Sequence, residues 1–186
     1  LDRMLQDLNE ILRLENDTDL SFSKVDLAEC LEEVEQVLSG EILLSKARIH
    51  KQLDICVLEY RRTAIFSIMH NLLSNAIKYR DPERLPEITI ESRESQESVS
   101  IVVKDNGLGV DLEKHGEEIF SLYRRFHTHV EGSGMGLYIC RLQVEKLGGT
   151  INIKSKTGAG TSIYVHLPKM THLNKNSSFL TGSNLE

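Results

Sequence analysis

The sequence predicts an α/β fold in which helices cover one face of a mixed, largely antiparallel sheet. Several segments carry apolar residues at steps of three and four, which predicts helices. Two pairs of short alternating segments, each pair joined by a few polar or glycine residues, predict hairpins. Strands and helices do not alternate as a doubly wound parallel sheet requires, so a two-layer sandwich is expected.

The composition fits one globular domain with a short additional element. The chain has 186 residues, of which 40% are hydrophobic and 27% charged, and its formal net charge is −6. This acidic balance argues against broad nucleic-acid binding. No apolar run is long enough for a membrane helix, and no secretory leader is evident. Cys30, Cys56 and Cys140 lack disulfide or zinc-site spacing, which fits a reducing cytosol.

The N-terminal residues predict a helix with a coiled-coil seam, because leucines recur there at steps of four and three: Leu1, Leu5, Leu8 and Leu12. This helix either folds onto the domain or belongs to a helical bundle that continues upstream. The chain starts at Leu1 rather than Met, so we expect a piece of a longer protein. Residues 15–24 are polar and predict a linker or the entry to a short strand.

The further elements follow in order along the chain. A helix begins after Asp26, which with Glu29 resembles a capping box, and Gly40 interrupts or ends it. Asp81-Pro82 ends the next helix. One or two short strands are expected within 47–58. One hairpin is expected from the strands 87–93 and 99–103, and a second from the strands 150–156 and 161–167. Two longer helices are expected over 61–80 and 135–147.

Residues 106–134, between the two hairpins, predict a lid. They are rich in glycine, histidine and charge, with one short helix expected near 112–120. Long loops of this kind inside a compact domain are often lids that close over a ligand. The helix after it stops at Gly148-Gly149.

Three clusters in the sequence carry chemistry. Asp105-Asn106-Gly107-Leu108-Gly109 follows a strand, and residues 132–136 place three glycines just before a helix, where backbone N–H groups bind phosphate. Asn71, Asn75 and Lys78 share one helical face, which suits a metal–phosphate group. Taken singly, the first is also typical of an ordinary turn and the third of a solvated polar face.

Together and in this order, the clusters resemble the nucleotide-binding domain of bacterial histidine kinases, within the GHKL ATPase superfamily that includes gyrase and the ninety class of heat-shock chaperones. The matching segments are 71–80 (N box), 105–109 and 132–136 (two glycine boxes), 119–127 (phenylalanine-containing box) and 158–168 (closing hairpin). The resemblance implies a Bergerat-type ATP-binding fold.

The resemblance also implies the division of the chain. Residues 1–16 would be part of the dimerisation and phosphotransfer bundle, residues 17–24 a linker, and residues 25–168 the catalytic domain. Residues 169–186 are expected to be a disordered tail, ending in Leu185-Glu186 of the kind a vector leaves.

The resemblance assigns one end of the site to adenine. The Asp105 carboxylate accepts a hydrogen bond from the adenine amino group but not from the carbonyl of guanine. Thr161 helps to bind this end, often through water. Tyr79 packs on the purine, and Gly107 and Gly109 let the chain pass close to the nucleotide.

The other end is assigned to the phosphates. Asn75 would ligate Mg²⁺ through its amide oxygen, Asn71 would lie one turn earlier, toward the metal and the γ-phosphate, and Lys78 would contact phosphate. The lid hinge would be freed by Gly132, Gly134 and Gly136, which Leu137 follows. The γ-phosphate would be contacted by Arg125. The lid would be anchored by Phe120 and Phe126.

Asn71 stands where ATP-hydrolysing members of the superfamily carry a glutamate as general base. An amide cannot take a proton, so the resemblance implies phosphoryl transfer rather than hydrolysis. The acceptor would be a bundle histidine, and residues 1–16 contain none. Of the seven histidines, His70 is expected to be packed, and His115, His127 and His129 to lie on a solvated lid rather than in a metal site.

The sequence is therefore interpreted as the ATP-binding catalytic part of a two-component sensor histidine kinase. The full protein would be a cytoplasmic homodimer, with any membrane anchor upstream, while this piece would be monomeric or weakly dimeric. It would pass the phosphoryl group to its own bundle histidine and then to an aspartate of a response-regulator receiver domain. Two alternatives are a degenerate nucleotide-binding scaffold or regulatory module without phosphotransfer, and a gyrase-like clamp with steady hydrolysis.

Overall fold

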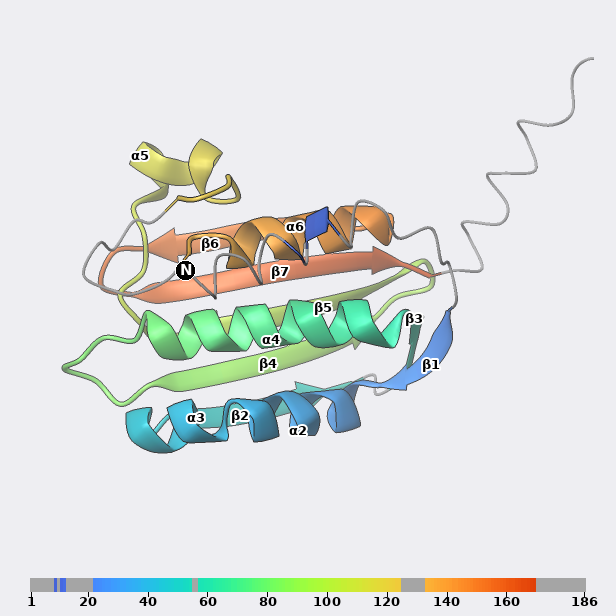
Figure 1. The fold of residues 1–186 in the computed structure, drawn as a ribbon, viewed down its shortest axis with the longest axis horizontal. Helices are drawn as coiled ribbons and strands as arrows, with labels where there is room; N and C mark the ends of the chain where they lie inside the picture. The colour runs from blue at the N-terminus through green and yellow to red at the C-terminus, as the bar shows by residue number, and fades with distance from the viewer. Residues whose placement is uncertain (1–8, 10, 13–21, 55–56, 125–132, 170–186) are drawn as a thin grey trace, which may run out of the picture.

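The computed structural model describes residues 9, 11–12, 22–54, 57–124 and 133–169. They form two layers, a sheet and a set of helices that lies over one of its faces (Figure 1). The five-stranded sheet has the order β2-β4-β5-β7-β6, in which β2 and β4 are parallel and all other neighbours antiparallel. The predicted fold class is confirmed.

The sheet is built on the two predicted hairpins. β4 pairs with β5, and β6 with β7, each antiparallel. The parallel strand β2 comes from the loosely alternating segment 47–58. The bounds are β2 (Arg48–Leu53), β4 (Glu87–Glu94), β5 (Ser98–Asp105), β6 (Thr150–Lys156) and β7 (Gly160–Pro168). Alternate residues of β4 and β5 are buried under the helices, which is the pattern of a sheet with one covered face.

Three helices cover the sheet: α2 (Leu27–Val37), α4 (Arg62–Lys78) and α6 (Gly136–Lys146). The predicted cap is confirmed, because Asp26 Oδ1 accepts from the backbone N–H groups of Ala28 at 2.8 Å and Glu29 at 3.2 Å. α4 ends at Lys78, before the predicted stop at Asp81. At the end of α6, Gly148 has φ +73° and its N–H donates to Glu145 O, so the predicted glycine stop is confirmed.

A second, two-stranded sheet joins β1 (Ser23–Asp26) to β3 (Val57–Tyr60) in antiparallel register. The Tyr60 hydroxyl donates to the backbone oxygen of Pro168 at 2.5 Å, which fastens this small sheet to the end of β7. The Tyr60 ring is 2% exposed, and burial raises the pKa of its hydroxyl to about 12.

The N-terminal segment is described at Asn9, Ile11 and Leu12, which are helical. Ile11 is 7% exposed and packs against Met135 and Ile139, at the start of α6. This end of the predicted helix therefore contacts the domain beside the second glycine cluster. Domain boundaries at residues 16, 24 and 168 stay predictions. In the described part of the chain, no helix combines the length and apolar character that crossing a membrane requires.

Gly40 lies inside α3 (Ser39–Ser45), so it neither ends the helical region nor breaks it; the break falls at Leu38. No atom lies within 4 Å of a Cβ added at Gly40. We expect Gly40→Ala to stabilise the fold by about 0.5 kcal/mol, because alanine loses less backbone freedom in a helix. Chemical denaturation measures this change, and a destabilised variant would contradict the helical conformation of residue 40.

Candidate nucleotide site

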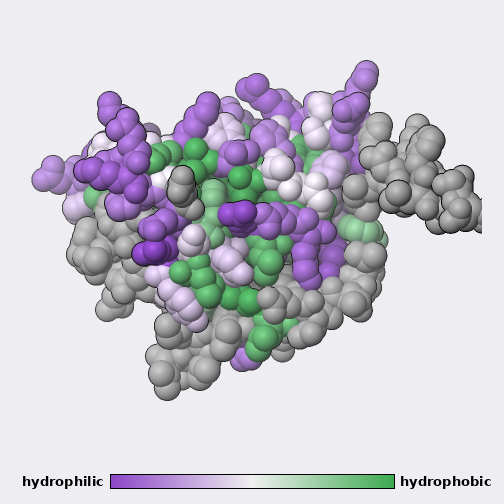
Figure 2. All heavy atoms as spheres, turned by 90° about the horizontal axis from the view of Figure 1, so that it is seen from above, coloured by the Kyte–Doolittle hydropathy of each residue, from purple (hydrophilic) through white to green (hydrophobic). Residues whose placement is uncertain are grey.

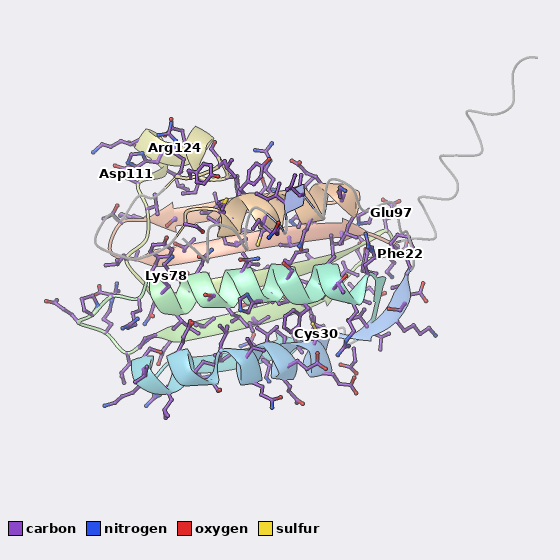
Figure 3. The ribbon with its side chains drawn as sticks, in the orientation of Figure 1. Phe22, Cys30, Lys78, Glu97, Asp111 and Arg124 are labelled. Atoms are coloured by element: carbon purple, nitrogen blue, oxygen red, sulfur yellow. The ribbon has the colours of Figure 1, made fainter. Side chains whose placement is uncertain are left out.

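A cavity of about 560 Å³ brings the three clusters together. It lies between α4, the start of α6 and the ends of β5 and β7. Its lining includes ten of the predicted residues: Asn71, Asn75, Lys78, Tyr79, Asp105, Gly109, Gly134, Gly136, Leu137 and Thr161. Lys78 at the end of α4 lies at the same end of the molecule as Asp111 and Arg124 (Figure 3).

One end of the cavity, which the sequence assigns to adenine, is a row of three residues on neighbouring strands. Asp105 of β5 pairs in register with Thr161 of β7, which pairs with Ser155 of β6. Asp105 Oδ1 accepts from Gly107 N at 2.8 Å and from Thr161 N at 3.2 Å. These bonds fix the carboxylate and leave its second oxygen for a further donor.

The Asp105 carboxyl is held in a partly dehydrated position. Burial raises the pKa of this carboxyl, while the N–H groups of Gly107 and Thr161 oppose the rise by stabilising the ionised form. A ligand donor such as an amino group would stabilise the ionised form further. The site is therefore suited to a ligand that presents a donor at this end.

Glycines in the first cluster allow the backbone to pack against itself. A Cβ at Gly107 would lie 2.4 Å from Tyr79 O, and one at Gly109, where φ is +64°, would lie 2.0 Å from Lys156 O. Leu108 N donates to Tyr79 O at 2.9 Å. Gly107 therefore packs against the backbone of Tyr79, whereas Gly109 lines the cavity.

Two side-chain amides mark the other end. Asn71 Nδ2 donates to Ser67 O at 3.0 Å, which holds this amide in place along α4. A Cβ built on Gly136 would lie 3.2 Å from Asn71 Oδ1 and 3.4 Å from Asn75 Nδ2. The first residue of α6 therefore faces both amides, and glycine leaves room between them. Lys78 Nζ lies 4.9 Å from the centre of the Tyr79 ring.

The lid is described at its two ends. α5 (Leu112–His115) and the short 3₁₀ turn η1 (Gly116–Glu118) confirm the helix expected near 112–120. Arg124 pairs with Glu118 at 2.7 Å. At Gly134, φ is +76° and an added Cβ would lie 2.7 Å from Arg124 O, so the two ends meet. Several predicted lid residues lie outside the described residues: Arg125, Phe126, His127, His129 and Gly132.

Phe120 and the outer face of α6 line a second hollow of about 340 Å³, together with Tyr138 and Leu142. Seen from above, hydrophobic residues gather among hydrophilic ones on the side of the molecule where α5 and α6 lie (Figure 2). Arg141 and Glu145 also line this hollow, and the role of Phe120 as a lid anchor stays a prediction.

Sequence reasoning gave no individual role to three residues that hold the site together. Arg84 Nη2 donates to Asp81 Oδ2 at 2.8 Å, Gly107 O at 3.1 Å and Gly158 O at 2.9 Å, and so joins three loops. Asn106 bonds both Glu87 N and Leu85 O at 2.9 Å. Ser155 contacts the lid and β7. The alternation of β6 places Ser155 on the same face as Ile151 and Ile153. This alternation is the one sequence feature that indicates that Ser155 faces the site.

A two-layer sandwich with a carboxylate at one end of a cavity and amides at the other is an arrangement suited to a nucleotide. Residues 60–171 match the family described as histidine kinase-, DNA gyrase B-, and HSP90-like ATPase. This match extends over more than half of the chain, and the chain therefore belongs to this family. The predicted family is confirmed.

The relatives are proteins much longer than this chain. Cyanobacterial phytochrome A of Nostoc sp. is 33% identical over 162 residues, which cover 80% of this chain and 21% of the relative. Methanogenesis regulatory histidine kinase FilI of Methanothrix harundinacea is 38% identical over 107 residues, covering 58% of this chain and 12% of the relative. The chain thus spans about a fifth or less of these proteins.

Solved structures show the same fold. The catalytic domain of histidine kinase ThkA superposes with a TM-score of 0.69 at 27% identity, over 81% of this chain and 99% of that chain. Histidine kinase AdeS of Acinetobacter baumannii superposes with a TM-score of 0.74 at 18% identity, over 89% of this chain and 77% of that chain. ThkA in complex with the response regulator protein TrrA gives a TM-score of 0.73 at 25% identity, over 92% and 48% of the chains.

Proposed function

We propose that this chain binds Mg·ATP and donates its γ-phosphoryl group to a histidine on a dimerisation bundle, as the catalytic part of a sensor histidine kinase. The observation that carries the proposal is the single cavity with the Asp105 carboxylate at one end and the Asn71 and Asn75 amides at the other. A carboxylate acceptor suits the adenine amino group, and amide oxygens suit a magnesium–phosphate group. Relatives named as histidine kinases support the same function.

The residues at the phosphate end fit Mg²⁺. The amides of Asn71 and Asn75 border one position, Gly136, and amide oxygens are hard ligands of the kind Mg²⁺ prefers. Among the described residues there is no group of three or more His, Cys, Asp and Glu placed to hold a metal. Asn75 would hold the ion through its amide oxygen, with phosphate and water as the other ligands. Bound there, Mg²⁺ would neutralise phosphate charge.

The chain's own residues would position the nucleotide. Asp105 and Thr161 hold the base, Tyr79 packs on it, and Lys78 contacts the phosphates. Gly134, Gly136 and Leu137 lie where the lid hinge meets the start of α6, and Gly132 and Arg125 are assigned to the lid itself. Asn71 cannot accept a proton from water, so transfer is favoured over hydrolysis, and the acceptor nitrogen must come from the bundle.

The proposed partners follow from this chemistry. The leucine spacing of residues 1–12 supports a homodimeric bundle in the full protein. ThkA was solved in complex with a response regulator, which supports transfer from the bundle histidine to a receiver-domain aspartate. Since ATP and receiver domains are cytoplasmic, this part of the protein would act in the cytoplasm.

Titration calorimetry with a non-hydrolysable ATP analogue, with and without Mg²⁺, tests the binding step. We expect Asn75→Ala to weaken binding in Mg²⁺ roughly tenfold or more, about 1.4 kcal/mol, with a smaller effect in EDTA. Asn152→Ala, at an exposed position of β6 (Thr150–Lys156), is the matched control and should bind like the wild type. Equal weakening of Asn75→Ala with and without Mg²⁺ would contradict the metal assignment.

Transfer is tested separately, by adding labelled ATP and a bundle fragment that carries the family histidine. Label on the fragment's histidine supports the kinase. Binding without transfer to a matched bundle would support the scaffold alternative, and steady release of phosphate by this chain alone would support the clamp.

A further inference from the structure

Ser155 is the third member of the row that ends at Asp105. It lies on β6, directly opposite Thr161 in the register of β6 and β7. Its hydroxyl is partly buried and has three neighbours within hydrogen-bonding distance. They are Val110 N at 2.8 Å, Gly160 O at 3.0 Å and Thr161 Oγ1 at 2.9 Å.

The three neighbours settle which hydroxyl donates to the other. A serine hydroxyl has one proton and two lone pairs. Gly160 O is a carbonyl oxygen and can only accept, so it takes the serine proton. Val110 N–H can only donate, so it occupies one lone pair. The bond between Ser155 and Thr161 must then be donated by Thr161 to the remaining lone pair.

The consequence falls on Thr161. Its single proton points at Ser155, away from the cavity that its side chain lines. Its lone pairs are the groups left for a ligand or a water. Beside it, Asp105 Oδ1 already accepts two backbone N–H groups, and the carboxylate has no proton to give when ionised. The base end therefore offers acceptors and no side-chain donor from these two residues.

We propose that Ser155 is a positioning residue that sets base specificity: by taking the Thr161 proton, it makes the base end selective for a nucleotide that presents an amino group. The inference rests on the proposed function, because it assumes that the base lies against Asp105 and Thr161. An adenine amino group, or the water that bridges to it, donates into such a site. The carbonyl oxygen that replaces this amino group in hypoxanthine needs a donor, and the side chains of Asp105 and Thr161 provide none.

The same hydroxyl joins the base end to the first residues of the lid. Val110 N follows directly after Gly109, and its bond to Ser155 holds this backbone against β6. Loss of the Ser155 hydroxyl would therefore loosen the lid connection as well as release the Thr161 proton. Loosening of the loop affects all nucleotides alike, whereas release of the proton affects adenine and hypoxanthine nucleotides in opposite directions.

The test measures the ratio of the dissociation constants of IDP and ADP by calorimetry. These ligands differ at C6, which carries an amino group in adenine and a carbonyl in hypoxanthine, and at the adjoining N1, which is an acceptor in adenine and an N–H donor in hypoxanthine. The ratio therefore reports which pattern of donors and acceptors the base end prefers. We expect a strong preference for ADP in the wild type, and a ratio at least about fivefold smaller in Ser155→Ala, because a free Thr161 hydroxyl can turn and donate. Ser155→Thr keeps a hydroxyl and should retain the preference. Ser162→Ala, on the opposite face of β7, is the control and should leave the ratio unchanged.

A double-mutant cycle shows whether Ser155 acts through Thr161. Thr161→Val removes the hydroxyl and keeps the shape of the side chain. In the Thr161→Val background, Ser155→Ala should change the ratio no further. Thermal unfolding of each variant checks that it is folded.

The outcomes separate the two proposals. A Ser155→Ala variant that binds ADP and IDP more weakly by the same factor has lost only support for the loop, and the inference on specificity is overturned. A change of the ratio that persists in the Thr161→Val background overturns it too. If the folded wild type binds neither nucleotide, the proposed function itself is wrong. If the wild type prefers ADP and Ser155→Ala keeps that preference, only the role of Ser155 is wrong.

Discussion

Replacing Asp105 by asparagine is expected to remove most of the ATP affinity while leaving the fold at least as stable. Asparagine can present an NH₂ group where the adenine amino group needs an acceptor. The lost charge-assisted hydrogen bond and the mismatched donors together cost about 2–3 kcal/mol, roughly 30- to 150-fold in the dissociation constant.

The expected gain in stability follows from the burial of Asp105. The amide oxygen of asparagine can still accept from Gly107 N and Thr161 N, so both internal bonds survive. Burial raises the pKa of the Asp105 carboxyl, which means that the ionised form is the costly one in the folded protein. The contribution of the Asp105 carboxyl to the stability of the fold is therefore fully present below its unfolded-state pKa, where the group is neutral. It is lost as the pH rises through the folded-state pKa and the group ionises. At neutral pH the folded wild type buries an ionised carboxylate, which lowers its stability, whereas the variant buries a neutral amide.

Two measurements check this pair of effects. Calorimetry gives the ATP affinity, and thermal unfolding without nucleotide gives the stability. Asp54→Asn makes the same chemical change at an exposed aspartate and should alter neither. The ATP affinity of the wild type should also fall as the pH is lowered through the raised pKa of Asp105, because the neutral acid is a poorer acceptor. Full ATP affinity in Asp105→Asn would mean that the base does not lie at this carboxyl.

The sequence predicts the parts of this molecule that depend on local pattern. Alternation predicts both hairpins, and the capping position of Asp26 predicts the start of α2. The three clusters of the site stand out because each has several polar or glycine residues at fixed spacing. The lining of the cavity confirms that they lie together.

The contacts that fix the site depend on tertiary structure and could not be predicted in this way. Arg84 and Gly158 are bonded across 74 positions of sequence, and only the turn between β6 and β7 brings them together. The hydrogen bonds of Ser155 to Gly160 O and Val110 N could not be predicted, because they depend on how the loop after β5 and the start of β7 are placed against β6. The parallel pairing of β2 with β4 likewise depends on a crossover through α4, not on the strand's own residues. The close packing of Gly107 was not predictable either, because its packing partner, Tyr79 O, lies on another element.

Gly160→Ala is expected to be among the most destabilising single substitutions of the site. Gly160 has φ +94°, and an added Cβ would lie 2.0 Å from Asp105 O and 2.8 Å from Asn106 Cα. Relief of this overlap requires the start of β7 to move away from the end of β5, which breaks the Thr161 N to Asp105 Oδ1 bond. We expect a loss of about 3 kcal/mol or more, a fall in Tm of roughly 10 °C, and loss of ATP binding.

Gly158 provides the control within the same turn. Its φ is +76°, also in the left-handed region, but no atom lies within 4 Å of an added Cβ. Gly158→Ala therefore carries only the backbone penalty, about 1 kcal/mol, and should still bind ATP. Thermal unfolding and calorimetry on the two variants separate backbone strain from steric contact. Since the two positions share their sign of φ, a similar loss in both would show that the approach of β7 to Asp105 adds nothing. A larger loss at Gly160 would show that the strand contact beneath Asp105 is what requires glycine there.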